Sequence, residues 1–335
     1  MSNARSGHSG LLVISAADVR RALPMSDCIA GVESAMRAVS RGTARIPLRT
    51  IFALPQTQHM FGVMPGYVSS PEGLGAKVLS VFPENRERGL ASHVGVVILF
   101  DSETGVPLAV MDAGQVTAIR TAAASAVATR VLARGDATEL AILGTGEQAA
   151  THLEAMAKVR PLRRVRVWGR SAHKAQSFAE QAKGQVAAPI EVCITPADAV
   201  AGAHIVCTVT ASRDPVLYGA DLEPGTHVNL VGSSQVTARE ADDVVVTRSR
   251  FYVDSRVSAR AEAGELRHAI EAGVVDESHV RGEIGEVLDG AVEGRRSPDE
   301  ITVYKSLGIA AQDLAAARLI YQRATRDGLG TRVPF

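Results

Sequence analysis

Two hydrophobic patterns divide the chain near residue 113. Before that point, short apolar runs follow one early amphipathic segment, Ser26–Arg41, which has apolar positions three and four residues apart and ends at Gly42. This spacing predicts a helix. Strands in series with few helices between them favour an antiparallel or mixed sheet. The predicted strands, punctuated by Pro65-Gly66 and Pro71-Glu72-Gly73, are Arg49–Leu54, His59–Met64, Ala76–Phe82 and Val94–Phe100.

The second pattern starts with an alanine-rich helix, Gln115–Ala133, that stops at Gly135. After it, short apolar strands alternate with helices, which predicts a parallel sheet covered on both faces. The predicted strands are Leu140–Leu143, Arg164–Trp168, Glu191–Ile194, His204–Thr208, His227–Val231 and Phe251–Asp254, and the predicted helices are Gln148–Lys158, Ala172–Ala182, Pro196–Ala201 and Ala310–Ala324.

These patterns predict an α/β protein with a Rossmann-type doubly wound sheet and a separate α+β domain. The length of 335 residues also favours two domains. We expect a disordered lead-in over residues 1–10 and an α+β domain over 11–125, to which residues 310–335 return. The doubly wound, dinucleotide-binding domain is expected over 126–309.

Composition excludes several classes of protein. Apolar residues make up 46% of the chain, too many for a disordered protein, and 36 basic residues balance 36 acidic ones, which disfavours nucleic acid as a partner. We find no apolar stretch near the roughly 20 residues that span a membrane, and no signal-peptide core. The three cysteines and the histidines show no metal-ligand spacing, and we expect a reducing, cytoplasmic location without a metal.

A glycine-rich turn, Gly144-Thr145-Gly146-Glu147-Gln148-Ala149, follows a predicted strand and opens a predicted helix. This is the GxGxxA form of the dinucleotide-binding motif. Gly144 permits the tight turn, Gly146 lets a pyrophosphate approach the backbone, and Ala149 keeps helix and strand close. The amides at the helix N-terminus then face the phosphates. A glycine-rich turn without a ligand is the alternative.

The end of the next strand indicates which dinucleotide is bound. An NAD site usually has an acidic residue there for the ribose hydroxyls, but this chain reads Gly169-Arg170-Ser171. Arg170 could pair with a 2′-phosphate, and Ser171 could add a hydrogen bond. The sequence therefore favours NADPH, with NADH as a weaker cofactor. The alternative is a solvated surface arginine.

Three cations lie in apolar surroundings. Arg120 has Val116, Ala123 and Ala124 as helical neighbours, and a guanidinium buried there needs an anion, either a substrate carboxylate or an unseen acid of the chain. Lys77 lies in an apolar strand, so its ammonium is either desolvated, with a lowered pKa suited to proton donation, or extended to water. Arg49 repeats the pattern more weakly, as a second carboxylate clamp or an exposed edge residue.

The chain resembles the ornithine cyclodeaminase and mu-crystallin family from about Leu11 to Ala324. The resemblance rests on the glycine-rich turn and on four further stretches. These are Gly75-Ala76-Lys77, Ala118-Ile119-Arg120-Thr121-Ala122-Ala123, Val231-Gly232 and Val303-Tyr304-Lys305-Ser306-Leu307-Gly308.

The resemblance implies a homodimer whose first domain holds the substrate and whose second holds a nicotinamide cofactor. Lys77 and Arg120 would be catalytic, and Arg49, Lys77 and Arg120 would bind the substrate carboxylate, in a cavity facing the nicotinamide ring. His93 could otherwise be an ordinary turn histidine. The expected cofactor contacts, from the motif and the resemblance together, are Ser92, His93, Arg120, Gly144, Thr145, Gly146, Glu147, Gln148, Gly169, Arg170, Ser171, Thr210, Val231 and Ser306.

One departure from the family narrows the expected reaction. Cyclodeaminases of this family carry an aspartate two residues after the Val-Gly pair, where this chain has Ser234. A serine cannot act as a carboxylate base. We therefore expect NADPH-dependent reduction of a cyclic imino acid, 1-pyrroline-2-carboxylate to L-proline or its six-membered analogue 1-piperideine-2-carboxylate to L-pipecolate. The alternatives are an ornithine or lysine cyclodeaminase, an alanine dehydrogenase-like enzyme, and a non-catalytic NADPH-binding protein.

Overall fold

The computed structural model describes residues 10–335, apart from the side chains of residues 86 and 87. These residues form two compact units. The first comprises the chain up to Arg120 together with Ala310–Phe335, and the second comprises Thr121–Ile309. The boundary predicted from the sequence lies at 125/126. All but the last residue of the expected lead-in, 1–10, lies outside the described residues.

The sheet of the first unit has seven strands in the order β15-β1-β6-β5-β4-β3-β2. Strands β1 and β6 are parallel, and the other neighbours are antiparallel, so the expectation of a mixed sheet is confirmed. The strands are β1 (Leu11–Ile14), β2 (Thr50–Ala53), β3 (Met60–Ser69), β4 (Glu72–Val81), β5 (His93–Phe100), β6 (Pro107–Asp112) and β15 (Thr331–Val333).

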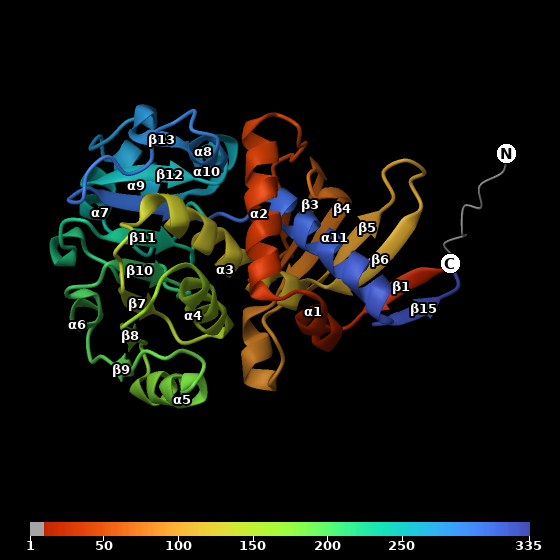
Figure 1. Ribbon diagram of the computed structural model, residues 1–335, viewed down its shortest axis with the longest axis horizontal. Coiled ribbons are helices and arrows are strands. Elements are labelled where there is room, and N and C mark those ends of the chain that lie inside the picture. Colours follow the sequence, from red (N-terminus) through yellow and green to blue (C-terminus); the bar gives the residue numbers. More distant parts are fainter. Residues whose placement is uncertain (1–9) are drawn as a thin grey trace. The chain divides into compact units, whose positions relative to one another are not determined.

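Helix α11 (Ala310–Asp327) lies across this sheet and contacts β3, β4 and α2 (Figure 1). Glycines allow the close approach: a Cβ on Gly66 would lie 3.1 Å from the Cβ of Ala310, and one on Gly73 would lie 3.0 Å from the carbonyl oxygen of Leu314. Larger side chains would push the helix off the strands. The other helices that begin in this unit are α1 (Ala16–Ala22), α2 (Met25–Ser40), the 3₁₀ helix η1 (Pro83–Arg88) and α3 (Ala113–Leu132), in which the unit boundary falls.

One strand end in this unit was predicted at the wrong place from a proline and a glycine. Pro65-Gly66 was expected to end a strand, but both residues lie inside β3 and pair with Ala76 and Gly75 of β4. The prediction was wrong because β2 pairs with β3 only as far as Val63, which leaves the missing N–H of Pro65 on an edge where no ladder needs it. Strand β4 consequently begins at Glu72 rather than Ala76.

The second unit contains an eight-stranded sheet in the order β13-β12-β14-β11-β10-β7-β8-β9. All of its pairs are parallel, and every residue of β10, β11 and β14 is buried, which requires cover on both faces. The predicted fold class is confirmed. The strands are β7 (Glu139–Leu143), β8 (Arg164–Trp168), β9 (Ile190–Val192), β10 (Ile205–Thr208), β11 (His227–Leu230), β12 (Ser249–Val253), β13 (Val280–Glu283) and β14 (Ile301–Lys305).

The strand order reverses between β7 and β10, and the glycine-rich turn follows β7. In open parallel sheets, ligands bind outside the carboxyl ends of the strands at such a reversal. The four short α-helices between β11 and β14 and the strands β13 and β14 were not predicted, because helices of five to eight residues carry little periodicity. The helices are α4 (Glu147–Val159), α5 (Ala172–Ala182), α6 (Pro196–Val200), α7 (Asp243–Thr247), α8 (Arg256–Glu262), α9 (Gly264–Glu271) and α10 (Ile284–Leu288), with 3₁₀ helices η2 (Gly219–Asp221) and η3 (Glu277–His279).

Within the described residues, each helix is too short or too polar to cross a membrane.

Candidate functional site

Lys77 is buried in the middle of β4 and is only 3% exposed. Its Nζ lies 3.0 Å and 2.9 Å from the two carboxylate oxygens of Asp313 on α11. The alternative of an ammonium extended to water is therefore wrong. Burial lowers the pKa of Lys77 to about 8, although the charge of Asp313 opposes this shift. A lysine with this pKa can donate a proton near neutral pH.

Arg120, on α3, shares the same carboxylate. Its Nε donates to Oδ1 of Asp313 at 2.9 Å, and its Nη1 donates to the side-chain oxygen of Gln312, also at 2.9 Å. Its Nη2 has no hydrogen-bond partner within residues 10–335. Asp313 is thus the acidic residue of the chain that was the alternative partner for Arg120. It pairs with only part of the guanidinium.

Arg49 is half-buried just before β2, and its charge lowers the pKa of Lys77, so it lies within electrostatic range of that ammonium. The structure therefore joins two of the predicted cations, Lys77 and Arg120, through one carboxylate, and Arg49 acts on Lys77 electrostatically. Although burial alone would raise it, the pKa of Asp313 is held below its usual value by Arg120 and Lys77. Sequence reasoning missed Asp313. An acidic residue in the apolar, alanine-rich start of α11 was the signal that could have revealed it.

The glycine-rich turn of the second unit depends on small residues. Gly144 has a φ of +130°, and a Cβ there would lie 2.7 Å from the carbonyl oxygen of Val209. Its amide donates to the carbonyl of Trp168 at 2.8 Å. A Cβ on Gly169 would lie 2.6 Å from the Thr145 methyl group. The ends of β7 and β8 are therefore packed against each other, with two glycines at the contact.

Helix α4 begins directly after this turn with Gly146 as its N-cap, which lacks a side-chain cap. A Cβ on Gly146 would meet nothing within 4 Å, so the space over the first turn is open, while Ala149 is fully buried beneath it. The Ser306 hydroxyl, after β14, is buried and has no hydrogen-bond partner in the described part of the chain. Open amide-bearing backbone and an unsatisfied hydroxyl fit the phosphates and sugars of a dinucleotide.

Arg170 and Ser171, which follow β8 at the expected cofactor-selecting position, are exposed to solvent. Arg170 is exposed and has no ion-pair partner in residues 10–335. Ser171 is the N-cap of α5, and its side-chain oxygen accepts from the amide of Lys174 at 3.4 Å. The oxygen thus accepts the hydrogen bond of the cap, while the hydroxyl proton of Ser171 can be donated to another acceptor.

A buried carboxylate that sequence reasoning missed joins the ends of β10 and β11. Glu240 accepts from the hydroxyl and amide of Thr210 at 2.6 Å and 2.7 Å, and from the amide of Gly232 at 2.6 Å. It also accepts from the Thr208 hydroxyl at 2.7 Å. Burial raises the pKa of Glu240, and these donors oppose the rise. Half-buried Val231 directly precedes Gly232 in the chain, so the backbone at the predicted contacts Thr210 and Val231 is held in place.

Glu265 and Lys305 form a second buried ion pair beside Glu240. The Nζ of Lys305 lies 2.8 Å from Oε2 of Glu265, both side chains are 0% exposed, and Oε1 of Glu265 accepts from the amide of Glu240 at 3.0 Å. Lys305 lies in the stretch that carried the family resemblance. Its contacts are internal to the second unit, which indicates a structural part.

Ser92 and His93 belong to the first unit, where the Ser92 hydroxyl lies 3.2 Å from Nδ1 of His93 at the start of β5. The other expected cofactor contacts, Arg120 excepted, belong to the second unit. Binding of one cofactor by both sets stays a prediction.

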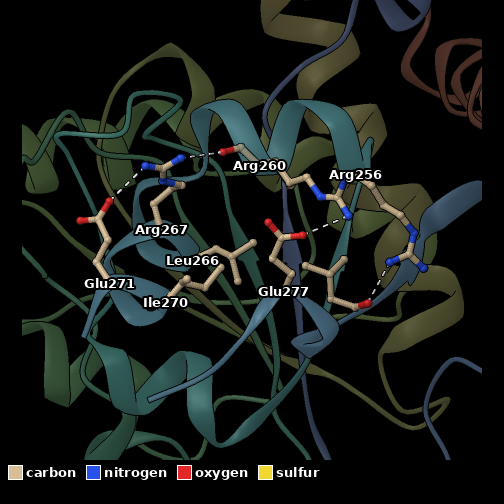
Figure 2. Close-up of a pocket in the computed structure, with 9 residues that line it drawn as sticks. Arg256, Arg260, Leu266, Arg267, Ile270, Glu271 and Glu277 are labelled. Carbon is tan, nitrogen blue, oxygen red and sulfur yellow. Dashed lines mark hydrogen bonds and ion pairs between the residues drawn. The ribbon is translucent and has the colours of Figure 1, made fainter. Parts of the chain in front are cut away.

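A cavity of about 250 Å³ opens elsewhere in the second unit, between α8, α9 and η3 (Figure 2). Arginines surround it, but Arg260 pairs with Glu277 at 3.1 Å and Arg267 pairs with Glu271 at 3.1 Å. Arg256 donates to the carbonyl of Val280 at 2.9 Å. These guanidinium groups are already engaged, so the cavity offers an anion little.

The profile of the ornithine cyclodeaminase/mu-crystallin family matches residues 11–328. The chain belongs to this family. It is 35% identical over 326 residues to the Δ1-pyrroline-2-carboxylate reductase of Bacillus cereus, covering 97% of this chain and all of that protein. It is 36% identical over 293 residues to the ketimine reductase mu-crystallin of Mus musculus, covering 87% and 90%.

Among solved structures, this chain is similar to Thermococcus litoralis Δ1-pyrroline-2-carboxylate reductase in complex with NADH and L-proline, with a TM-score of 0.94. The two are 36% identical over 96% of this chain and all of that one. Ser234, at the position where the cyclodeaminases of the family were expected to have aspartate, is half-buried in the loop after β11.

Proposed function

We propose that this protein reduces a cyclic imino acid with NADPH, converting 1-pyrroline-2-carboxylate to L-proline, with 1-piperideine-2-carboxylate as a second substrate. The observation that carries the proposal is the buried Lys77, which has a pKa suited to proton donation. It lies beside Arg120, whose guanidinium is only partly hydrogen-bonded within the described residues. The similarity to reductases over nearly the whole chain supports the same reaction class.

The substrate carboxylate pairs with Arg120, whose Nη2 is available while Asp313 and Gln312 hold the other side of the guanidinium. A guanidinium held in this way loses little freedom on binding. Arg49 adds a second positive charge. Together they orient the imine relative to Lys77.

Lys77 supplies the proton. Its Nζ–H bond breaks as a proton moves to the imine nitrogen, which makes the ring an iminium, and the proton is later replaced from water. A reduced nicotinamide, when bound, supplies the hydride that forms the new C–H bond at the imine carbon. Asp313 remains ionised throughout and stabilises the ammonium.

NADPH selectivity rests on Arg170, which is exposed and available to a 2′-phosphate, with the Ser171 hydroxyl beside it. The absence of an acid at Gly169 removes the usual preference for unphosphorylated ribose. Ser234 argues against the cyclodeaminase reaction, because a hydroxyl cannot replace the carboxylate base that ammonia release requires.

A homodimer is the proposed assembly. Strand β2 is a sheet edge, and Ile51 and Phe52 on it are 46% and 53% exposed, next to Leu48 at 43%. An edge with large apolar side chains is what a second copy would cover. The three cysteines form no disulfide, which supports a reducing compartment such as the cytoplasm.

The test is NADPH oxidation followed across five- and six-membered cyclic imino acids, with NADH for comparison. We expect turnover of both rings and a preference for NADPH. Pyruvate with ammonia, and ornithine with NAD, are the comparison reactions. Faster turnover of either, or tight NADPH binding without any imine reduction, would refute the proposal.

The preference for NADPH is tested with Arg170→Gln. The matched control is Arg163→Gln, at another exposed arginine. Loss of Arg170 should reduce the preference for NADPH roughly tenfold, which corresponds to about 1.4 kcal/mol. An unchanged preference would show that Arg170 does not contact the 2′-phosphate.

A further inference from the structure

We propose that Asp313 is a positioning residue that fixes the Lys77 ammonium and the Arg120 guanidinium in one geometry and keeps Lys77 protonated for the reaction. The inference rests on the proposed function for the meaning of that proton. The shared carboxylate itself is a feature of the first unit alone.

The geometry is that of a single carboxylate serving two cations. Oδ1 of Asp313 lies 3.0 Å from Nζ of Lys77 and 2.9 Å from Nε of Arg120, while Oδ2 lies 2.9 Å from the same Nζ. The Asp313 side chain is 1% exposed. Because water does not compete in this environment, the ion pairs set the positions of both cations.

The number of donors distinguishes this cluster from an ordinary structural ion pair. Two buried cations share one carboxylate, Nη2 of Arg120 lacks a partner in the described chain, and so does the buried side-chain nitrogen of Gln312. A buried cluster with more donors than acceptors is costly unless a further anion completes it. The carboxylate of the substrate is that anion, and Asp313 sets where it is received.

The charges around Lys77 show why Asp313 controls its proton. Arg120 on α3 and Arg49 before β2 both disfavour the ammonium, and the two residues paired with Lys77 across the sheet, Met64 and Val97, are uncharged. On α2, burial raises the pKa of the Cys28 thiol, which keeps it neutral. Asp313 is therefore the group that sustains the ammonium against burial and two like charges.

Two variants separate charge from position. Asp313→Asn removes the charge at nearly constant shape, and we expect the basic limb of kcat/KM against pH to move down by roughly one to three pH units. Asp313→Glu keeps the charge but displaces it, so the limb should stay in place while kcat falls. The control is Asp27→Asn, which removes a carboxylate paired with Arg323 at 2.8 Å in the same unit; it should move neither.

A second readout needs no turnover. The chain has five lysines, Lys77, Lys158, Lys174, Lys183 and Lys305, so a ¹³C,¹⁵N-lysine NMR spectrum contains five side-chain signals, and Lys77→Met identifies one of them. The pKa of Lys77 should fall in Asp313→Asn and not in Asp27→Asn. An unchanged Lys77 pKa in Asp313→Asn overturns the inference.

If Asp313→Asn does not fold, Asp313→Glu tests the positioning role by itself. Wild-type kcat in Asp313→Glu overturns the positioning role, and a lower kcat with an unmoved pH limb supports it. Failure of the proposed function looks different, because the wild-type protein would then reduce none of the imines while its Lys77 titration still responded to Asp313→Asn.

Discussion

Within residues 10–335, each unit contains one buried lysine–carboxylate pair, and the two pairs differ in what surrounds them. In the first unit, Lys77 and Arg120 share Asp313, so positive groups outnumber the carboxylate. In the second unit, Lys305 pairs with Glu265, whose other oxygen accepts from the backbone next to a second carboxylate, Glu240. The first cluster therefore holds two cations on one carboxylate, and the carboxylate of the second is bonded to its own backbone.

The difference shows which property separates the two buried pairs. Burial alone does not distinguish them, because Lys77 is 3% exposed and Lys305 is 0% exposed. What distinguishes them is the number of cations that share the carboxylate. Glu240 satisfies four donors at the ends of β10 and β11. Asp313 instead pairs with two cations, Lys77 and Arg120.

Loss of Lys77 should have the largest effect on activity. Lys77→Met removes the proton donor, and turnover of the cyclic imine should fall by roughly 10² to 10⁴. NADPH affinity, measured by fluorescence titration, should change little. The matched control is Lys158→Met, at an exposed lysine of α4, with activity near wild type. Near-normal turnover in Lys77→Met would show that Lys77 is not the acid.

Loss of Lys305 should act on stability instead. Lys305→Met leaves the Glu265 charge buried without its partner, and the free energy of unfolding should drop by about 3–5 kcal/mol. Lys77→Met should cost less, because Arg120 still pairs with Asp313. Urea denaturation of both variants measures the difference. Equal losses would remove the distinction between the two clusters.

The last expected effect appears only in acid, and it belongs to the second unit. Burial lowers the pKa of His152 to about 4 and of His227 to about 3, so both are neutral in the folded state at pH 6. The unfolded chain binds protons from about pH 6.5 downward. Stability is thus fully present above that pH and is lost as the pH falls toward the folded values, by about 1.4 kcal/mol per pH unit for each histidine.

The variant that tests this is His152→Gln. It can preserve hydrogen bonds to Ser125 and to the carbonyl of Gln148, which the imidazole contacts at 2.9 Å and 2.7 Å. The decline in unfolding free energy between pH 6.5 and pH 4 should be shallower than in the wild type. An identical decline would show that His152 does not carry the linkage.

Local patterns predicted the elements with long, regular signals. Strand β8 and helix α5 have the predicted bounds, and the glycine-rich turn lies between β7 and α4 as expected. Short-range rules suffice there because helix periodicity, glycine conformation and parallel-strand burial act within a few residues. Elements such as β1 and α7 were missed because four or five residues carry too little pattern.

The two cations that share Asp313 were also visible in the sequence, since a charged residue among apolar neighbours is a local anomaly. Lys77 and Arg120 were recognised in this way. Asp313 was not, because it lies 236 residues from Lys77 and no local rule links the two. Glu240 likewise acquires its meaning only from Thr210 and Gly232, 30 and 8 residues away.

The amino-acid order alone therefore accounts for the two layered units, the dinucleotide-type turn and the identity of the buried cations, because each follows from neighbours along the chain. Which acidic residue pairs with those cations depends on three-dimensional packing. Glycines of β3 and β4 let α11 lie against the sheet, and that contact brings Asp313 to Lys77 and Arg120. Electrostatic partners are chosen by distance in space, which the spacing of residues in a sequence does not encode.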